Sequence, residues 1–439
     1  MIVKFDVVVI GAGLGGMLAT AYLARAGLKV AMLEKRDIPG GRYTTINFEG
    51  FKVNTGAWNI GVHGPNGPVY KAIVEDLKCK VEVKIPGPPD RRFRVKGIDY
   101  DFPEKGGLKL MLGKVARSEK EADRVMNVIR RSLSWGGEDT YNDITFEEWL
   151  FQHTDDRGIH GAMDWIIRAM TGMNYFDMSA AEYISILRNF GRCKGVTTAP
   201  KDGNKATTDA LMNLIANLKA EVFLSSPVGQ IIVNDGKAMG VVADTREGRR
   251  LEIESRFIVS DVGPKETMKL AGNKNFNESY LKAVNSLKEV NAATTIFVYD
   301  KPITGYDGFY CWPEVERIAT VWEPHYCWPG YVPEGQYCLY CFCTFRTNNI
   351  KREVQLGQEE CMQEFPALRK ARILHVNLFA GNWPVLRARA GQTLKARTPV
   401  ENLYTVGDAF NPSGWTVGEG VAVVVKEVAQ EIIAKSKGQ

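Results

Sequence analysis

The apolar positions near the amino terminus form two short runs separated by a stretch with helical spacing. Residues 5–10 are mostly β-branched and apolar, which is typical of a strand buried on both faces. Residues 17–26 place apolar side chains on one face of a helix, and residues 29–33 form a second apolar run. This order of strand, helix and strand predicts an α/β fold with a Rossmann-type sheet.

The rest of the chain divides into regions with different periodicities. Residues 106–190 are predicted to be mostly helical, with Ser or Thr followed three residues later by Glu at 118, 145 and 179. Residues 291–345 are predicted to form strands, starting from the β-rich run 294–299. The composition of residues 84–97 predicts a loop that leads into a pair of strands. The remaining expected elements are a helix at 207–218, strands at 221–224, 227–231, 257–261 and 402–408, and a final helix at 421–434.

Composition narrows the class of protein. The chain has 439 residues, of which 45% are hydrophobic, so it is long enough for two cores. Its net charge of +5 is spread among charges of both signs, which does not favour nucleic-acid binding. No apolar run reaches the length of a membrane span, and the amino-terminal run is predicted to be a strand rather than a signal peptide. The eight cysteines lack the spacing of a disulfide framework, which favours a reducing, cytoplasmic setting.

The residues that follow the first strand predict a dinucleotide site. Gly11 allows the tight turn from strand to helix, and Gly13 lets the backbone approach a diphosphate. Gly15 or Gly16 lets the helix pack closely on the strand, while the helix amino terminus offers free N–H groups to the phosphates. Glu34 ends the second strand and is placed to accept hydrogen bonds from ribose hydroxyls.

Two further segments favour FAD over NAD. The segment from Lys35 to Arg42 supplies a second pair of glycines and a cation, which suits a second pass of backbone along the phosphates and flavin. The strand 402–408 ends in Gly407 and Asp408, and an acid there can accept from the ribityl hydroxyls. The glycine-rich start of the final helix can direct N–H groups at the flavin. We find no second GxGxxG motif, so a built-in NAD(P) site is not expected.

These segments resemble the FAD-dependent amine oxidase and phytoene desaturase superfamily. The resemblance implies a glutathione-reductase-like FAD-binding domain formed by residues 1–75, 195–270 and 385–439. It also implies a discontinuous α+β substrate domain formed by residues 76–194 and 271–384. The residues expected to bind FAD are Gly11, Gly13, Gly15, Gly16, Glu34, Lys35, Gly41, Arg42, Gly56, Ala57, Trp58, Val228, Gly407, Asp408, Trp415, Thr416 and Val417.

The resemblance offers two main chemistries, and the chain departs from the usual pattern of both. Amine oxidases of this superfamily have a lysine beside the flavin, but our alignment places Thr295 there, and Val417 lies near the position of a flanking aromatic residue. Phytoene desaturases have small residues where this chain has Trp415, and Ala57-Trp58 replaces another small stretch. A long polyene would not fit, so a compact apolar substrate such as a cyclic terpenoid or an alicyclic ketone is expected.

Aromatic and sulfur-containing side chains are the candidate walls of the substrate chamber, and ordinary core packing is the competing interpretation for each. The candidates are Trp165, Met173, Tyr175, Trp312, Trp322 and Tyr340. His63, Glu419 and Tyr310 are the candidates for proton handling. For His63 the alternative is a structural histidine, and for Glu419 it is stabilisation of the helix amino terminus.

Two other features have competing interpretations. The cysteines around Cys341 and Cys343 suggest a metal site, but their alternation within a β-rich run favours small apolar side chains on one strand face, so no metal is expected. Residues 108–112, flanked by lysines, form a candidate membrane-surface helix, for which a core-facing helix is the alternative.

The sequence therefore predicts an FAD-dependent enzyme that dehydrogenates a carbon–carbon bond by hydride transfer to flavin N5. A quinone, an electron-transfer protein or oxygen would reoxidise the flavin. Saturation or isomerisation of an isoprenoid would use the same site, and amine oxidation is a further alternative. A prenyl-binding protein similar to Rab GDP-dissociation inhibitors is the alternative without catalysis, and the intact glycine and acid motifs argue against it. The oligomeric state stays open.

Overall fold

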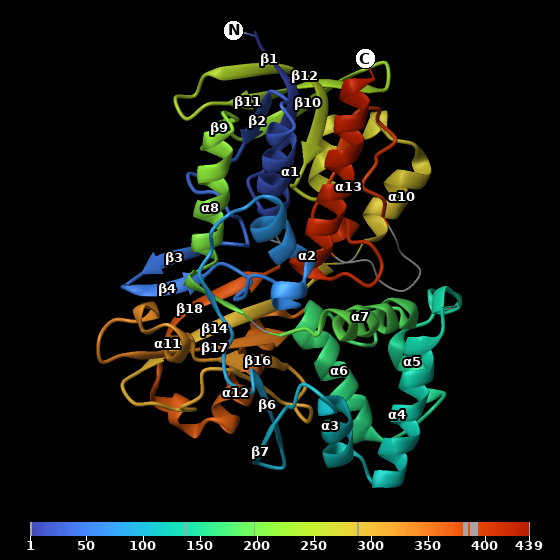
Figure 1. Cartoon of the computed structure of the whole chain (residues 1–439), viewed down its shortest axis with the longest axis vertical. Helices are drawn as coiled ribbons and strands as arrows, with labels where there is room; N and C mark the ends of the chain where they lie inside the picture. Colours follow the sequence, from blue (N-terminus) through green and yellow to red (C-terminus); the bar gives the residue numbers. More distant parts are fainter. Residues whose placement is uncertain are drawn as a thin grey trace.

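The strand at the amino terminus lies inside a sheet whose members come from three distant parts of the chain (Figure 1). The computed structural model describes residues 2–136, 138–196, 198–287, 289–380, 385–386 and 394–438. Within these residues the first sheet has the order β10-β11-β12-β1-β2-β9, and β20 pairs with β12. Its strands are β1 (Ile2–Ile10), β2 (Val30–Leu33), β9 (Glu221–Phe223), β10 (Val228–Asn234), β11 (Lys237–Asp244), β12 (Arg250–Ser260) and β20 (Leu403–Thr405).

Helices cover both faces of this sheet. Val7 and Val9 pack against one helical layer, whereas Val8 and Ile10 pack against the other, and all four side chains are buried. This double burial explains why β1 is a continuous apolar run. The first layer contains α1 (Leu14–Arg25), α8 (Asn204–Asn217) and α13 (Val417–Lys437), and the second contains α9 (Pro264–Ala271) and α10 (Glu278–Ser286).

The second sheet confirms the strands expected in residues 291–345 and the strand pair expected after residue 84. Its order among the described residues is β18-β14-β17-β16-β15-β6-β7. Helix α12 (Ile350–Glu364) packs on one face. The strands are β6 (Arg91–Val95), β7 (Ile98–Asp101), β14 (Ala292–Tyr299), β15 (Phe309–Cys311), β16 (Ile318–Trp322), β17 (Tyr337–Thr344) and β18 (Arg372–Phe379).

The helical region expected at 106–190 is present and lies beside the second sheet (Figure 1). Ser118, Thr145 and Ser179 each cap a helix by accepting the N–H three residues later, as the sequence predicts. Of these three caps, only Thr145 shows the reciprocal bond, in which the glutamate accepts from the N-cap N–H, because Glu121 and Glu182 accept from other groups. The helices are α3 (Gly107–Val115), α4 (Glu119–Ser134), α5 (Phe146–Phe151), α6 (Arg157–Thr171) and α7 (Ala180–Cys193).

Short elements connect the two sheets. The hairpin of β3 (Thr45–Phe48) and β4 (Phe51–Asn54) reaches the second sheet, where Asn377 of β18 donates to the backbone carbonyl of Asn54. The other short elements are α2 (Pro68–Tyr70), a π-helical turn (Lys71–Asp76), β5 (Val83–Lys84), β8 (Ala199–Gly203), β13 (Glu289–Val290), α11 (Pro324–Cys327) and β19 (Val385–Leu386), with 3-10 turns at Gly64–Asn66, Glu138–Tyr141, Asn273–Asn275, Pro329–Tyr331, Pro366–Lys370 and Asp408–Phe410.

The architecture is therefore a mixed α/β fold in which segments of the two sheets interleave along the chain. The expected domain boundary at residues 384 and 385 adjoins residues outside the described part, so those limits stay a prediction. Among the residues that the structure describes, no helix has the length and apolar character needed to cross a bilayer.

The bounds of one expected helix need correction, and the packing of another favours the core-facing interpretation. The final helix begins at Val417 rather than at residue 421, so Glu419 lies within its first turn. Its early glycines are compatible with a helix because they allow close packing: a Cβ at Gly418 would lie 3.2 Å from a methyl group of Leu14. In α3, Met111 and Leu112 are buried in the helical core, so these side chains pack against protein rather than facing a membrane surface.

A buried histidine gives the fold a pH-dependent stability. His325 follows β16 and packs against the rings of Tyr326 and Tyr337, and burial lowers its pKa to about 4. Because the unfolded chain binds a proton near pH 6.5, stability is complete above that pH and falls as the pH drops toward 4. We expect this residue to account for up to about 3 kcal/mol of the loss.

Chemical denaturation of the wild type and of His325→Phe at pH 7 and pH 4.5 measures this effect. The variant keeps a ring between the two tyrosines but cannot titrate, so its free energy of unfolding should fall less between the two pH values. Equal pH dependence in the two proteins would show that His325 is not responsible.

Candidate functional site

The turn between β1 and α1 has the geometry expected of a diphosphate cradle. Gly11 has φ +95°, a conformation that favours glycine. Gly13 is the N-cap of α1, and the first N–H groups of a helix have no partner within the helix. A Cβ at Gly16 would lie only 1.9 Å from the carbonyl oxygen of Gly11, so helix and turn are in direct backbone contact. The sequence-based roles of these glycines as turn and packing residues fit this geometry.

The second glycine pair lies against the first. The N–H of Gly40 donates to the carbonyl of Ala12 at 2.7 Å, and a Cβ at Gly41 would be 3.6 Å from the Cα of Gly13. Arg42, the next residue, carries its guanidinium to Asp408, with 3.1 Å between Nη2 and Oδ2. The structure therefore brings together a cation, an acid and the helix amino terminus, although the two ends of this ion pair are 366 positions apart in the chain.

Glu34 is held at the edge of this cradle. Its Oε2 accepts from the N–H of Ala12 at 2.8 Å, and its Oε1 accepts from the N–H of Arg36 at 2.9 Å. Each oxygen keeps a second lone pair for a ribose hydroxyl. The backbone of Ser226 also bonds to Glu34, which brings the start of β10, and so Val228, to the same side. Lys35 is exposed to solvent.

The carboxyl-terminal segment completes the cradle from the opposite side. The N–H of Val406 donates to the carbonyl of Ser260, which fixes the end of β20 beside β12, and Gly407 has φ +114°. Further on, the hydroxyl of Thr416 donates to the carbonyl of Met170 at 3.2 Å, joining the start of α13 to the helical region. Val417 has φ +44° at the first helical position. The segment around Trp415 thus lies between the two parts of the molecule.

Asp261 is a site residue that the sequence reasoning missed. It follows β12, and its Oδ2 accepts from the N–H of Gly16 at 2.9 Å. A Cβ at Gly13 or at Gly15 would lie 2.6 Å from one of its oxygens. Burial is the largest cause that raises the pKa of Asp261 to about 7, and the carboxylates of Asp408 and Glu34 add to it. Its place directly after an apolar strand parallel to β1 is the signal that could have identified it.

His63 and Glu419, two of the proton-handling candidates, are in contact and fully buried. The N–H groups of His63 and Val69 donate to the two oxygens of Glu419 at 2.9 and 2.8 Å. A Cβ at Gly61 or Gly67 would lie within 2.6 Å of the same carboxylate. Glu419 therefore fastens the chain around His63 to the start of α13. This is a structural role, similar to the stabilisation of the helix amino terminus that was the alternative for Glu419.

The His63 ring lies beside the segment expected at the flavin. Its centroid is 5.4 Å from the ring of Trp415 and 5.5 Å from that of Phe190. Neither ring nitrogen has a hydrogen-bond partner of good geometry among the described residues, although Nδ1 is 3.3 Å from Glu419 Oε1. A buried ring with unused nitrogens is compatible with a role toward a bound molecule, so the assignment of His63 stays a prediction.

Trp58 connects the cradle to the second sheet. The backbone of Ala57 bonds to the carbonyl of Arg42, and a Cβ at Gly56 would lie 2.3 Å from that oxygen. Trp58 then inserts into a group of aromatic rings, which we call the aromatic wall. It consists of Trp58, Phe309, Trp322, Tyr340 and Phe342, with ring centroids 5.2–6.3 Å apart. Trp322 and Tyr340 are thus beside Trp58, a candidate FAD-binding residue, and their expected role as walls of the substrate chamber stays a prediction.

Tyr310 and Trp312 are on the opposite face of the same sheet, which corrects their expected placement. Both belong to the core under α12, where Trp312 donates to Glu364 at 2.8 Å and Tyr310 packs on Phe365. The reason is the alternation of side chains along β15, which points Phe309 toward Trp58 and Tyr310 away from it. Tyr310 therefore does not reach the aromatic wall, and neither a proton-handling role nor a substrate-wall role fits these two residues.

Trp165, Met173 and Tyr175 belong to the helical core rather than to the aromatic wall. Trp165 donates to the backbone carbonyl of Ala319 at 2.7 Å and so anchors α6 to the second sheet. The hydroxyl of Tyr175 lies 3.2 Å from Nδ1 of His160. Their contacts match the core-packing alternative.

Strand β14 carries two neighbouring threonines, Thr294 and Thr295, whose side chains lie on opposite faces of the sheet. Thr295 accepts from Gln358 of α12, whereas Thr294 shares its face with Ile296 and Val298, which pack with Trp58. Of the two threonines, Thr294 lies on the face toward Trp58, and neither position is a lysine. The Thr294 hydroxyl is buried and has no hydrogen-bond partner among the described residues. Alternation along the strand could have found it.

Cys341 and Cys343 are buried on one face of β17, as their alternation predicts. Their sulfur atoms are 3.6 Å apart. Cys338 lies on the opposite face, with the aromatic wall. Three metal-ligating side chains do not gather at any point in the described part of the chain.

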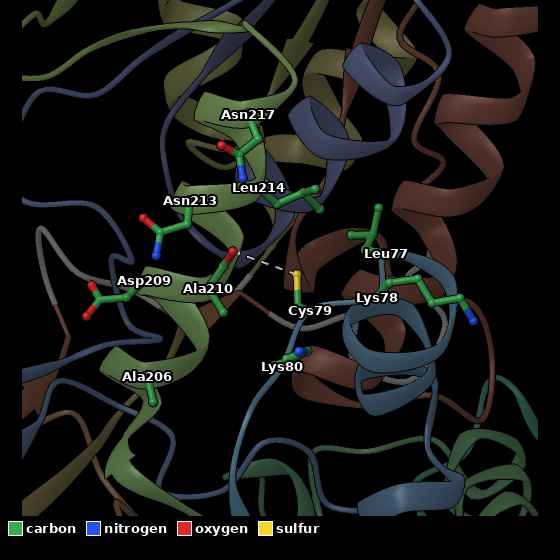
Figure 2. A pocket seen from close by; sticks show the side chains of 10 residues that line it. All are labelled: Leu77, Lys78, Cys79, Lys80, Ala206, Asp209, Ala210, Asn213, Leu214 and Asn217. Atoms are coloured by element: carbon green, nitrogen blue, oxygen red, sulfur yellow. Dashed lines mark hydrogen bonds between the residues drawn. The ribbon is translucent and has the colours of Figure 1, made fainter.

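A separate hollow lies on the surface, away from the cradle (Figure 2). It has a volume of about 430 Å³ and lies between residues 77–80 and α8, where the thiol of Cys79 faces the carbonyl of Ala210 at 3.8 Å. Its other polar side chains come from lysine, aspartate and asparagine residues, of which Asp209 and Asn213 point away from Cys79 in Figure 2. It contains none of the expected site residues.

Comparison with known proteins agrees with this geometry. The family model described as flavin containing amine oxidoreductase matches residues 14–432. An uncharacterized protein of Methanocaldococcus jannaschii is 28% identical over 97% of this chain and 98% of its own. Prolycopene isomerase 1 of an Oncidium hybrid is 25% identical over 96% of this chain and 82% of its own. A limonene dehydrogenase component of Castellaniella defragrans is 27% identical over 60% of this chain and 52% of its own.

A solved structure has the same fold along the whole chain. The crystal structure of an oxidoreductase from Methanosarcina mazei superposes with a TM-score of 0.85 at 26% identity and covers 97% of this chain and 100% of its own. The two glycine pairs bring the turn, the start of α1 and the segment at Gly40 into close backbone contact, and Arg42 with the α1 amino terminus offers donors that suit a diphosphate. The residues present therefore fit FAD. The chain belongs to the family of flavin-containing amine oxidoreductases, and its cofactor is FAD.

Proposed function

We propose that this flavoprotein dehydrogenates a carbon–carbon bond of a compact hydrophobic substrate, such as a terpenoid or an alicyclic ketone, on a glutathione-reductase-like FAD domain. The observation that carries the proposal is the aromatic wall. Trp58 leaves the cofactor segment and packs among the rings of Phe309, Trp322 and Tyr340. These rings are buried together in one apolar cluster, and a chamber bounded by such rings would bind an apolar molecule by contact area with few polar anchors.

The chain's own residues have distinct tasks in this proposal. Bound FAD supplies the acceptor of a hydride from the substrate carbon. Arg42 and the amino terminus of α1 hold its diphosphate, and the aromatic wall excludes water from the reacting face. The hydroxyl of Thr294, which has no hydrogen-bond partner in the part of the chain that the structure describes, offers one polar contact to a substrate oxygen. We propose His63 as the group that accepts the proton released by the substrate, and solvent is the alternative acceptor.

The relatives support this substrate class without deciding it. One is named as part of a limonene dehydrogenase, and limonene is a compact cyclic terpenoid. The small side chains of this superfamily are replaced by Trp58 and Trp415, which disfavours a long polyene. The absence of a lysine at Thr294 or Thr295 disfavours amine oxidation, which the family name keeps as an alternative. A prenyl-binding protein without catalysis fits poorly with an intact cofactor cradle.

Isomerisation of an isoprenoid is the second candidate reaction. The relative named prolycopene isomerase aligns with nearly the whole chain, and saturation would use the same site. A reaction with net oxidation also needs an external acceptor, for which we propose a quinone, an electron-transfer protein or oxygen. A location in the cytoplasm, with or without contact to a membrane, is likewise a proposal.

An anaerobic screen of flavin reduction tests the proposed function. The oxidised holoenzyme is mixed with cyclic terpenoids, alicyclic ketones and a panel of amines, and loss of the yellow flavin absorbance is followed. We expect bleaching by members of the first two groups. Bleaching by amines alone would contradict the proposal, and conversion of an isoprenoid without bleaching would favour isomerisation.

A further inference from the structure

The carboxylate of Asp261 lies in the place where the cofactor's diphosphate has to approach. Its oxygens are above the glycine turn, because a Cβ at Gly13 or Gly15 would touch them, and Oδ2 accepts from the N–H of Gly16. The other side is bounded by Gly407, whose Cβ would lie 3.2 Å from Oδ1. The chain thus places a negative group of its own on the helix amino terminus that binds the diphosphate.

The backbone keeps Asp261 close to this position. Its N–H donates to the carbonyl of Ile10 at 2.8 Å, which continues the pairing of β12 with β1. The side chain of the next residue, Val262, lies within 3.2 Å of a Cβ built at Gly11. A strand end fixed on both sides limits movement of the carboxylate to rotation about the side-chain bonds of Asp261.

Charges around the cradle are unbalanced once a diphosphate is present. The segment after β2 supplies Glu34 and the cation Arg42, the segment after β20 supplies Asp408, and the first turn of α1 supplies no acidic side chain. Among the residues that the structure describes, the charges acting on the Asp261 carboxylate are two further carboxylates and one guanidinium, before the two negative charges of the diphosphate are added. Repulsion of this kind in a region of low dielectric favours the neutral form of one acid.

We propose that Asp261 takes up a proton when FAD binds. The neutral acid continues to accept the hydrogen bond from the Gly16 N–H, and the affinity for FAD therefore depends on pH. The step forms one O–H bond on Asp261 with a proton from solvent and breaks no covalent bond in the protein. This role depends neither on which substrate is bound nor on the direction of the reaction.

The sign of the pH dependence follows from this coupling. The pKa of Asp261 is already about 7 because of burial, and an adjacent diphosphate raises it further. Below pH 7 the acid is neutral in both states, and FAD binds at full affinity. Above pH 7 binding requires a proton, so the dissociation constant rises by up to about tenfold for each pH unit.

Dissociation of FAD from the diluted holoenzyme measures the effect without any substrate. Released FAD is followed by its fluorescence at pH 6, 7, 8 and 9, and the slope of log Kd against pH gives the number of protons taken up. We expect a slope near zero at pH 6 that approaches one above pH 7 in the wild type. Asp261→Asn keeps an acceptor for Gly16 but has no charge, so its Kd should be tighter at pH 8 and change less than about twofold over this range.

The exposed acid Asp244, at the end of β11 in the same sheet, provides the matched control. Asp244→Asn should show the pH slope of the wild type. A flat wild-type curve would overturn the proposal even if Asp261→Asn fails to fold, and so would an equal slope in a folded Asp261→Asn. Because no turnover is measured, failure of this proposal is distinguishable from failure of the proposed function.

Discussion

Gly16→Ala is expected to lower the free energy of unfolding by about 3 kcal/mol and to abolish stable retention of FAD. A Cβ at this position would lie 1.9 Å from the carbonyl oxygen of Gly11, and the obstacle is backbone rather than a flexible side chain. Helix α1 would have to move away from the end of β1, which shifts the donors of the diphosphate cradle. Denaturant unfolding and the ratio of flavin to protein absorbance in the purified variant measure the two effects.

Gly191→Ala is the control for this substitution. Gly191 also lies within a helix, α7, but nothing is within 4 Å of a Cβ built there. Alanine is the better helix former, so the control should be neutral or more stable by up to about 1 kcal/mol and should retain FAD. If Gly16→Ala resembled this control, close contact of α1 with the turn would not be essential.

Glu419→Ala is expected to cost about 3–5 kcal/mol of stability and to weaken FAD binding. The substitution removes a fully buried carboxylate that accepts the N–H groups of His63 and Val69, and it leaves both donors buried without partners. The chain that carries His63 toward Trp415 would then lose its attachment to α13. Thermal and denaturant unfolding of the holoenzyme, together with flavin content, measure the loss.

Two further variants sharpen the test of Glu419. Glu427→Ala removes an exposed glutamate from the same helix and should change stability by less than about 0.5 kcal/mol. Glu419→Gln should lie between the wild type and the alanine variant, because the amide keeps one acceptor but presents its NH₂ group to a backbone donor. Wild-type stability in Glu419→Ala would show that the carboxylate does not fasten this segment.

Much of the fold could be predicted because the signals are local. The apolar run of β1, the glycines after it and Glu34 lie close together in the chain, and each has one physical use in a strand–turn–helix unit. Caps at Ser118, Thr145 and Ser179 are local for the same reason. The expected strands near residue 294 also appear where β-rich composition placed them.

Face assignments needed the tertiary structure. Tyr310 is a proton-handling candidate by its sequence neighbourhood, yet one step along β15 separates it from Phe309 and turns it to the face under α12. One step along β14 likewise separates Thr295 from Thr294. Side chains alternate along a strand, so an alignment that is uncertain by one residue cannot decide which face a side chain occupies.

The sequence by itself determined the strand–turn–helix unit of the cradle and its glycines, because these depend on residues joined by short stretches of backbone. Motifs at both ends of the chain together indicated FAD. Only the tertiary structure brought Arg42 to Asp408, Glu419 to the backbone around His63, and Asp261 onto the amino terminus of α1. Each of these contacts joins segments more than 200 positions apart in the chain. Such contacts are decided by how β12, β20 and α13 pack beside β1, and no periodicity within one segment records that packing.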